Sequence, residues 1–144
     1  NFITRGGSLG VGFPGAVGLK IANPDKTVIG FSGDGGSMYT FQALWTAVRY
    51  DVGAKFVVCH NKKYELLNVN IDQYWKDAGI PAHQHPTAFD LAAPGIDFVG
   101  LAKAFGANGC RLEKVEDAAE CAEAMLSTPG PFLVDVNTTD LIWR

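Results

Sequence analysis

Short apolar, β-branched runs alternate along this chain with longer segments of helical periodicity. The predicted strands are 27–31, 55–59, 109–115 and 131–137. Strands separated by helix-length segments pack as a parallel sheet, because a parallel connection needs a crossover such as a helix. The sequence therefore predicts an α/β fold, with a parallel sheet covered by helices on both faces in the doubly wound manner.

The segments between these runs carry the helical signals. Segment 6–18 starts as a glycine-rich loop and leads into a small-residue helix that ends near Asn23. In 37–50 the apolar residues repeat at i, i+3, i+4 and i+7, and Ser37 is the predicted N-cap. Proline-rich segment 79–94 is predicted to be an ordered loop. The remaining predicted helices are 64–75, 97–105 and 116–127.

The composition limits the class of protein. A length of 144 residues predicts one domain over 1–144, and a start at Asn1, directly before a glycine-rich loop, indicates a piece of a longer multidomain chain. The net charge of −3 argues against nucleic acid or an anionic membrane surface as the main partner. No apolar stretch approaches the roughly 20 residues that span a bilayer.

The cysteines are Cys59, Cys110 and Cys121, an odd number without a paired spacing. This pattern predicts reduced thiols in a cytoplasmic protein. Because Cys59 lies within an apolar run, it is expected to act as a small buried hydrophobe.

An acid stands within the glycine cluster GFSGDGGS, which follows the predicted strand 27–31. In open α/β sheets, ligands bind at the carboxyl ends of the strands, where glycines and a helix N-terminus favour an anion such as phosphate. The carboxylate of Asp34 would repel phosphate unless a divalent cation lay between them, and Mg²⁺ commonly binds one carboxylate together with phosphate oxygens. The cluster thus indicates a diphosphate–Mg²⁺ site; alternatively, Asp34 only supports a tight strand-to-helix turn.

A second strand end carries further oxygen donors. Strand 55–59 leads directly into His60-Asn61-Lys62-Lys63-Tyr64. The amide oxygen of Asn61 and the backbone carbonyl of Lys63 both suit Mg²⁺. Since parallel strand ends meet at one edge of the sheet, Asp34 and Asn61 are expected to face the same point.

These residues match the signature of a known family. The pattern Gly33-Asp34-Gly35, then 24 residues, then His60-Asn61 resembles that of thiamine diphosphate-dependent enzymes, in their C-terminal diphosphate-binding domain. The flanking segments GGSLGVGFPGAVG, ALWTAVRYDV and PGIDFVGLAKAFG are similar as well, so the resemblance covers nearly the whole chain. Within the family it is greatest to benzoylformate decarboxylase and other 2-oxo acid decarboxylases, and somewhat smaller to acetolactate synthases.

The resemblance implies a role for each matching position. Asp34, Asn61 and the Lys63 carbonyl would hold Mg²⁺, and backbone N–H groups of the two loops would contact phosphate oxygens. The Gly7 carbonyl would accept a hydrogen bond from the amine of the cofactor, and Leu9 would hold the cofactor bent, although an ordinary core leucine is the alternative for Leu9. The full implied cofactor-binding set is Gly7, Ser8, Leu9, Gly33, Asp34, Gly35, Gly36, Tyr39, Asn61, Tyr64 and Glu65.

The implied activity is non-oxidative decarboxylation of a 2-oxo acid to an aldehyde and CO₂. In this family the glutamate that activates the cofactor comes from a pyrimidine-binding domain of the same or a neighbouring subunit, so a homodimer or homotetramer is expected and this domain alone would be inactive. No candidate for that glutamate is evident. The acids in the last predicted helix and just before it are expected to form a solvated face: Glu113, Glu116, Asp117, Glu120 and Glu123.

Three positions depart from the family pattern. His60 replaces an asparagine, Glu65 places a charge near the diphosphate where the family usually has glycine, and Gly36 replaces a frequent serine. The pair His83 and His85 suggests a metal site, but a proline-bounded loop near the cofactor entrance is the better interpretation. Trp75, Phe89 and Trp143 are expected to be packing residues.

Other functions remain open at this point. An acetolactate synthase-like carboligase fits the same motifs. A nucleotide- or flavin-binding module would need a third glycine in a G-x-G-x-x-G pattern, which Gly33-Asp34-Gly35 lacks. A cofactor-free structural homologue is opposed by the presence of both Asp34 and Asn61.

Overall fold

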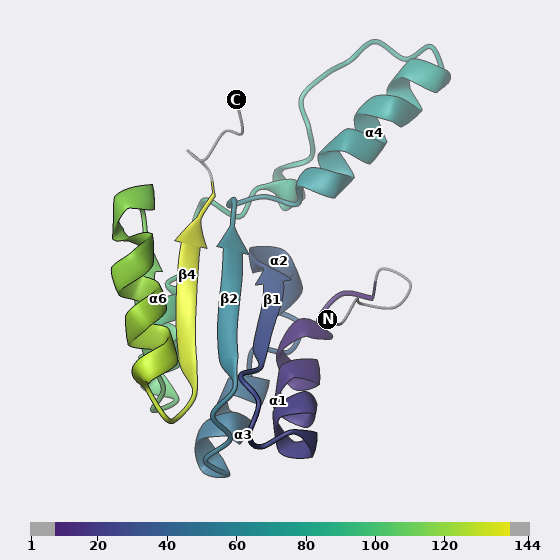
Figure 1. The fold of residues 1–144 in the computed structure, drawn as a ribbon. Coiled ribbons are helices and arrows are strands. Elements are labelled where there is room, and N and C mark those ends of the chain that lie inside the picture. The colour runs from purple at the N-terminus through teal and green to yellow at the C-terminus, as the bar shows by residue number, and fades with distance from the viewer. Residues whose placement is uncertain (1–7, 139–144) are drawn as a thin grey trace.

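A computed structural model describes residues 8–138 and contains one four-stranded sheet (Figure 1). The strands are β1 (Ile29–Gly33), β2 (Lys55–His60), β3 (Asn108–Leu112) and β4 (Phe132–Asn137). They lie in the order β1-β2-β4-β3, and every neighbouring pair is parallel. The predicted parallel α/β fold is therefore confirmed.

The helices connect these strands and cover the sheet. Residues at the amino-terminal ends of α2 and α4 lie above the carboxyl ends of β1 and β2, which places two loop–helix junctions at one edge (Figure 1). The α-helices are α1 (Gly12–Ala22), α2 (Asp34–Ser37), α3 (Ala43–Arg49), α4 (Glu65–Asp77), α5 (Phe98–Ala104) and α6 (Ala118–Ser127), with short 3₁₀ turns at Thr87–Phe89 and Val115–Asp117.

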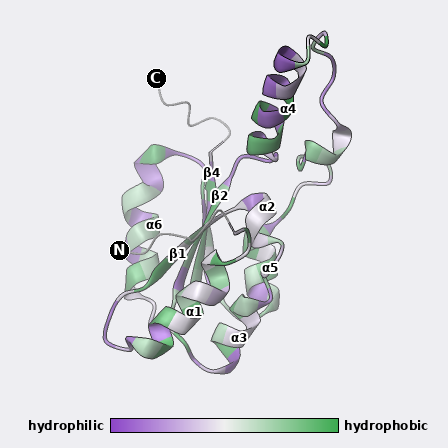
Figure 2. Cartoon of the chain, turned by 90° about the vertical axis from the view of Figure 1, so that its right-hand side faces the viewer, coloured by the Kyte–Doolittle hydropathy of each residue, from purple (hydrophilic) through white to green (hydrophobic). Residues whose placement is uncertain are grey.

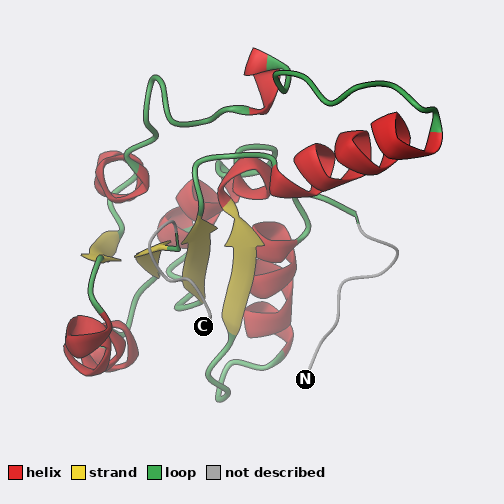
Figure 3. Ribbon diagram, turned by 90° about the horizontal axis from the view of Figure 1, so that it is seen from above, coloured by secondary structure: helices red, strands yellow, loops and turns green. Residues whose placement is uncertain are grey.

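The core is divided between the two faces of the sheet, because alternate strand residues point to opposite sides. Phe56 and Val58 of β2 join the larger cluster, in which α1, α3 and α5 bury Phe13, Leu44 and Phe98. On the other face, α6 packs over β3 and β4 in a smaller cluster, and Figure 3 shows α6 apart from the helices of the first face.

The second face is covered only in part. The register places Phe31 of β1 beside Val57 of β2, so both side chains belong to this face. Phe31 is 62% exposed and Ile29 is 37% exposed, whereas Val57 is buried. The β1 side of this face therefore presents apolar side chains that no described element covers.

The helix predicted over 37–50 is wrong in its start and continuity. Ser37 is fully buried inside α2, and its hydroxyl donates to the Asp34 carbonyl at 2.8 Å, so it is not an N-cap. Residues between α2 and α3 form turns, and there the Thr40 hydroxyl donates to the Gly10 carbonyl at 2.5 Å. This bond to a distant segment competes with helix continuation, and the local pattern could not show it.

The cysteines also differ from the prediction. Cys110 of β3 and Cys121 of α6 form a disulfide, with their Cα atoms 6.4 Å apart. Cys59 is the free cysteine of the chain, but it is exposed rather than buried. Packing of α6 against β3 brings the first two thiols within reach, a contact that their spacing did not indicate.

Helix α4 projects beyond the sheet (Figure 1), and hydrophilic and hydrophobic residues alternate along it (Figure 2). Trp75 is buried near its end, where its ring contacts the tilted ring of His83 at a centroid distance of 4.1 Å and stacks on that of His85 at 5.6 Å. His85 also contacts Asp72 at 2.7 Å. In residues 8–138 no helix combines the length and apolarity needed to cross a bilayer.

Candidate metal and cofactor site

A cavity of about 670 Å³ opens at the carboxyl ends of β1 and β2, where the sequence places its candidate residues. Of the predicted residues, those that line it are Leu9, Gly33, Asp34, Gly35, Gly36, Tyr39, Asn61, Lys63, Tyr64 and Glu65. Ser8 is exposed and does not line this cavity. Gly7 lies outside the described residues.

Asp34 joins the two strand ends. Its side chain is almost fully buried, and its two carboxylate oxygens accept hydrogen bonds from different segments. Oδ1 accepts from the Gly35 N–H at 2.8 Å, and Oδ2 accepts from the Lys62 N–H at 2.6 Å. Because each oxygen keeps a further lone pair, these bonds orient the carboxylate without exhausting its capacity to bind a cation.

The segment after β2 is held by the end of the proline-rich loop. The Tyr64 N–H donates to the Phe89 carbonyl at 2.9 Å, and the Leu91 N–H donates to the Lys62 carbonyl at 2.8 Å. Asn61 Oδ1 accepts from the Lys63 N–H at 3.2 Å, a bond that turns this amide oxygen toward the loop. The segment that carries the proposed metal-binding oxygens of Asn61 and Lys63 is thus held in place by the end of the proline-rich loop.

Gly33 and Gly35 lie on either side of Asp34 and have different surroundings. A Cβ built on Gly35 would overlap the ring of Tyr64, whereas a Cβ on Gly33 would meet nothing within 4 Å. Gly35 therefore lets Tyr64 lie directly against the α2 backbone, and open space adjoins Gly33.

The charges at the cavity are largely paired. Glu65, one of the departures from the family pattern, lies 2.8 Å from the Lys63 ammonium, and this hydrogen bond lowers the pKa of the Glu65 carboxyl. Desolvation, followed by the negative charge of Asp34, raises the pKa of the Cys59 thiol. His60 does not line this cavity, because its side chain points to the other face of β2.

The donor set suits a hard cation. The carboxylate of Asp34, the amide oxygen of Asn61 and the backbone carbonyl of Lys63 are all oxygens, as Mg²⁺ prefers. Residues 8–138 contain no group of three or more His, Cys, Asp or Glu side chains placed to hold a metal. His83 and His85 both contact the ring of Trp75.

Sequence reasoning missed the apolar part of the cavity. Leu66 and Leu67 of α4 line it, as do Ala88 and Phe89 of the returning loop. The adjacent leucines at the start of an otherwise polar helix could have indicated this apolar wall. The position of Phe89 could not be predicted in this way, because it depends on a contact with Tyr64, 25 residues earlier in the chain. Cys59 and Thr138 complete the lining.

Comparisons with known proteins identify the family of this fold and site. Residues 1–136 match the family model described as "Thiamine pyrophosphate enzyme, C-terminal TPP binding domain". The chain belongs to this family. The predicted resemblance is therefore confirmed, and the family's domain is the one that binds thiamine diphosphate.

Relatives within the family divide between two reactions. The chain is 34% identical to benzoylformate decarboxylase of Pseudomonas aeruginosa, over 95% of this chain and 24% of that protein. It is 31% identical to the large subunit of acetolactate synthase isozyme 2 of Escherichia coli, over 99% and 25% respectively. The solved 4-hydroxybenzoylformate decarboxylase of Rhodococcus jostii RHA1 superposes with a TM-score of 0.76 and 34% identity, over 90% of this chain and 23% of that chain.

The chain spans about a quarter of the length of these relatives. Decarboxylases and acetolactate synthases match it at similar identity, so the comparisons do not favour the decarboxylase group over the synthase group.

Proposed function

We propose that this chain binds the diphosphate end of thiamine diphosphate through Mg²⁺, as one domain of a non-oxidative 2-oxo acid decarboxylase. The observation that carries the proposal is the meeting of Asp34 and Asn61 at one cavity, with the Lys62 N–H bound to the Asp34 carboxylate at 2.6 Å. Membership of the thiamine pyrophosphate family supports the identity of the cofactor.

Each residue has a defined task in this proposal. Asp34, Asn61 and the Lys63 carbonyl would ligate the metal, which neutralises the diphosphate. Leu9, which is 63% exposed and lines the cavity, would support the bent cofactor from below. When bound, the cofactor supplies the electron sink for carbanion chemistry at a 2-oxo acid.

The activating glutamate would come from a pyrimidine-binding domain of the same or a neighbouring subunit, within a homo-oligomer. Apolar side chains around the cavity mouth agree with a further protein surface there, because Leu66 is 71% exposed and Tyr39 is 61% exposed. The substrate would then lie against Leu67 and Phe89, beside the cofactor.

Calorimetric titration of the purified protein with thiamine diphosphate, with and without Mg²⁺, tests the metal-dependent binding. Asn61→Ala is expected to weaken the Mg²⁺-dependent affinity by about 10-fold or more, since loss of even a residue that only supports a metal ligand typically costs that much. The matched control is Asn108→Ala, at the exposed start of β3 on the far side of the sheet, which should bind as the parent does. Equal binding with and without Mg²⁺ would contradict the proposal.

Acetolactate synthase-like carboligation is the second candidate, favoured by the 31% identity to the Escherichia coli isozyme. The two reactions differ in product, since decarboxylation releases one aldehyde for each CO₂, whereas carboligation joins the remaining fragment to a second 2-oxo acid. Measuring CO₂ together with aldehyde from aromatic and aliphatic 2-oxo acids distinguishes them. CO₂ release without aldehyde would favour the carboligase.

A further inference from the structure

The cavity of about 670 Å³ at the carboxyl ends of β1 and β2, which we call the cofactor cavity, is lined by three main segments of the chain. They are the loop before α1, the segment formed by α2 and the turns that follow it, and the segment after β2. In the proposed function the cofactor contacts all three. The bonds that hold these segments relative to one another therefore decide how well it fits.

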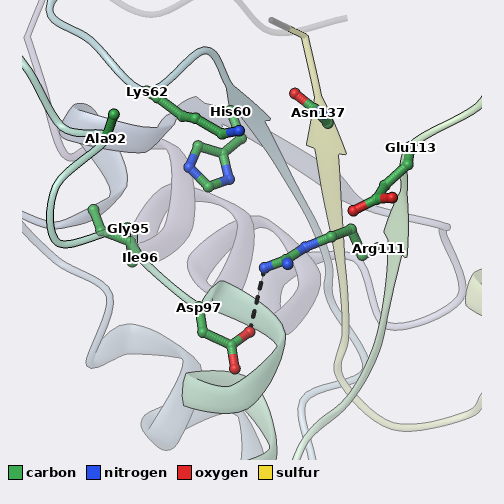
Figure 4. Close-up of a pocket in the computed structure, with 9 residues that line it drawn as sticks. All are labelled: His60, Lys62, Ala92, Gly95, Ile96, Asp97, Arg111, Glu113 and Asn137. Carbon is green, nitrogen blue, oxygen red and sulfur yellow. Dashed lines mark hydrogen bonds and ion pairs between the residues drawn. The ribbon is translucent and has the colours of Figure 1, made fainter.

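The segment after β2 is held to the sheet. The side chain of His60, at the end of β2, contacts the buried carboxylate of Asp135 in β4 at 2.9 Å. Asp135 also accepts a hydrogen bond from Arg111 of β3, and Figure 4 shows the same guanidinium bonded to Asp97 at the start of α5. Because these bonds join three strands and a helix, they fix this segment without help from the loop before α1.

The loop before α1 carries Leu9, whose side chain is mostly exposed. This side chain lies over the backbone of α2, since a Cβ built on Gly36 would be 3.9 Å from Leu9 Cδ2. Such a contact is an ordinary van der Waals distance and leaves most of the leucine uncovered. The position of Leu9 in the cavity must therefore be set mainly by the backbone of its loop.

The backbone of this loop is held by the segment that follows α2. The Thr40 hydroxyl donates to the Gly10 carbonyl at 2.5 Å. Gly10 has a φ of +81°, and a Cβ at this position would lie 2.9 Å from the Cβ of Tyr39, so the loop packs directly against its neighbour. The residue that directly follows Leu9 is thus fixed by one side-chain hydrogen bond and by close packing.

Thr40 belongs to the same run of turns as Asp34. Its N–H donates to the Ser37 carbonyl at 3.1 Å, and the buried Ser37 hydroxyl donates to the Asp34 carbonyl at 2.8 Å. The Thr40 hydroxyl then bonds a loop that lies 30 residues earlier in the chain. One hydroxyl therefore connects the segment that would hold the metal with the loop that would support the rings of the cofactor.

We propose that Thr40 is a positioning residue of the cofactor site, whose hydroxyl holds Leu9 in place relative to Asp34 through the Gly10 carbonyl. Thr40 touches neither the metal nor the diphosphate in this proposal, and it acts on the rings of thiamine diphosphate only through Leu9. The inference rests on the proposed function. It differs from it in assigning to Thr40 a contribution to ring binding that is separate from binding of the diphosphate.

Calorimetric titration of the purified protein in the presence of Mg²⁺ tests this separation with two probes, inorganic diphosphate and thiamine diphosphate. Inorganic diphosphate reports on the metal end alone, whereas thiamine diphosphate also reports on the support of its rings. Thr40→Val removes the hydroxyl but keeps the branched shape of the side chain. It should weaken binding of thiamine diphosphate about 2- to 10-fold, the range for one hydrogen bond, and leave binding of inorganic diphosphate unchanged.

Further variants distinguish this role from a general loss of structure. Thr40→Ser keeps the donor and should restore the affinity of the parent protein. In a Leu9→Ala background, Thr40→Val should cause no additional loss, because Thr40 acts through Leu9. The matched control is Thr128→Val, which removes a comparable bond from the Thr128 hydroxyl to the Ala124 carbonyl of α6 at 2.7 Å and should change the affinity for neither probe.

Nitrogen-15 relaxation of the backbone amides tests the hold on the loop without any cofactor. In Thr40→Val the order parameters of Leu9 and Gly10 should fall, while those of Asp34 and Gly35 should stay as in the parent protein. Unchanged order at Leu9 and Gly10, or an equal loss of affinity for both probes, would overturn the proposal for Thr40. If the parent protein bound neither probe, the proposed function would be wrong, and relaxation would still decide whether Thr40 holds the loop.

Discussion

Neighbouring glycines of the acid-bearing loop have different surroundings, and this difference shows what single residues contribute to the site. Gly35 is buried against the ring of Tyr64, and the Tyr64 N–H donates to the Phe89 carbonyl, which holds the backbone from which this ring projects. Gly33 has an ordinary extended backbone, with φ of −70° and ψ of 163°, and open space around it.

Gly35→Ala is therefore expected to destabilise the protein by roughly 1–3 kcal/mol, the typical cost of inserting a methyl group into a packed site. It should also weaken cofactor binding, because Tyr64 lines the cofactor cavity. The matched variant Gly33→Ala should change stability by less than about 0.5 kcal/mol. Urea unfolding of both variants checks this prediction, and equal losses would contradict the difference in packing.

Among the secondary-structure elements, β3 and α6 are joined by a covalent link, the Cys110–Cys121 disulfide. β3 is an edge strand, and α6 alone covers that end of the second face. The Cys110–Cys121 disulfide joins them across 11 residues of sequence, at the point where Cys121 is buried. Its expected effect is to restrict the unfolded chain, and so to stabilise this pair of elements.

The double variant Cys110→Ala/Cys121→Ala should lower the free energy of unfolding by about 2–3 kcal/mol, the value for a loop of this length. Reduction of the parent protein with dithiothreitol should lower its thermal midpoint in the same direction. Cys59→Ser serves as the control, because Cys59 is exposed and forms no disulfide. The thermal midpoint of this variant should fall on reduction by the same amount as that of the parent protein. A thermal midpoint insensitive to the reductant would argue against the role of this link.

In the molecule as a whole, the two faces of the sheet are covered unequally. The first face is closed by α1, α3 and α5, with Phe13 and Phe56 in ring contact at a centroid distance of 4.8 Å. The second face is closed over β3 and β4 but leaves Phe31 and Ile29 exposed on edge strand β1. An apolar edge of this kind marks a surface suited to contact with further protein.

Two phenylalanines of neighbouring strands make this asymmetry measurable. In the 144-residue chain, Phe56→Ala is expected to cost about 3–5 kcal/mol, because it empties a buried site. Phe31→Ala should cost less than about 1 kcal/mol, since its ring is 62% exposed. Chemical denaturation of the two variants gives both values, and similar losses would show that the second face is covered at β1 after all.

Local sequence patterns were sufficient to predict the four strands and the edge of the sheet that carries the site. Apolar runs mark β2 and β4, because burial on both faces selects apolar side chains at most positions, with the buried Asp135 of β4 as an exception. Asp34 and Asn61 could be paired from the sequence, since both follow strands whose carboxyl ends meet at one edge. The exposure of Glu113 and of the acids of α6 followed from the same local periodicity.

The remaining features depended on contacts between residues far apart in the chain, which no local pattern encodes. The Thr40–Gly10 bond divides a predicted helix in two, the Phe89–Tyr64 bond brings an apolar wall to the cofactor cavity, and the disulfide forms only once α6 lies on β3. Alternation along the strand turns His60 away from the neighbouring Asn61, and this is a local effect. Its partner Asp135 lies 75 residues away in the sequence, so the pair could not be identified from a local pattern.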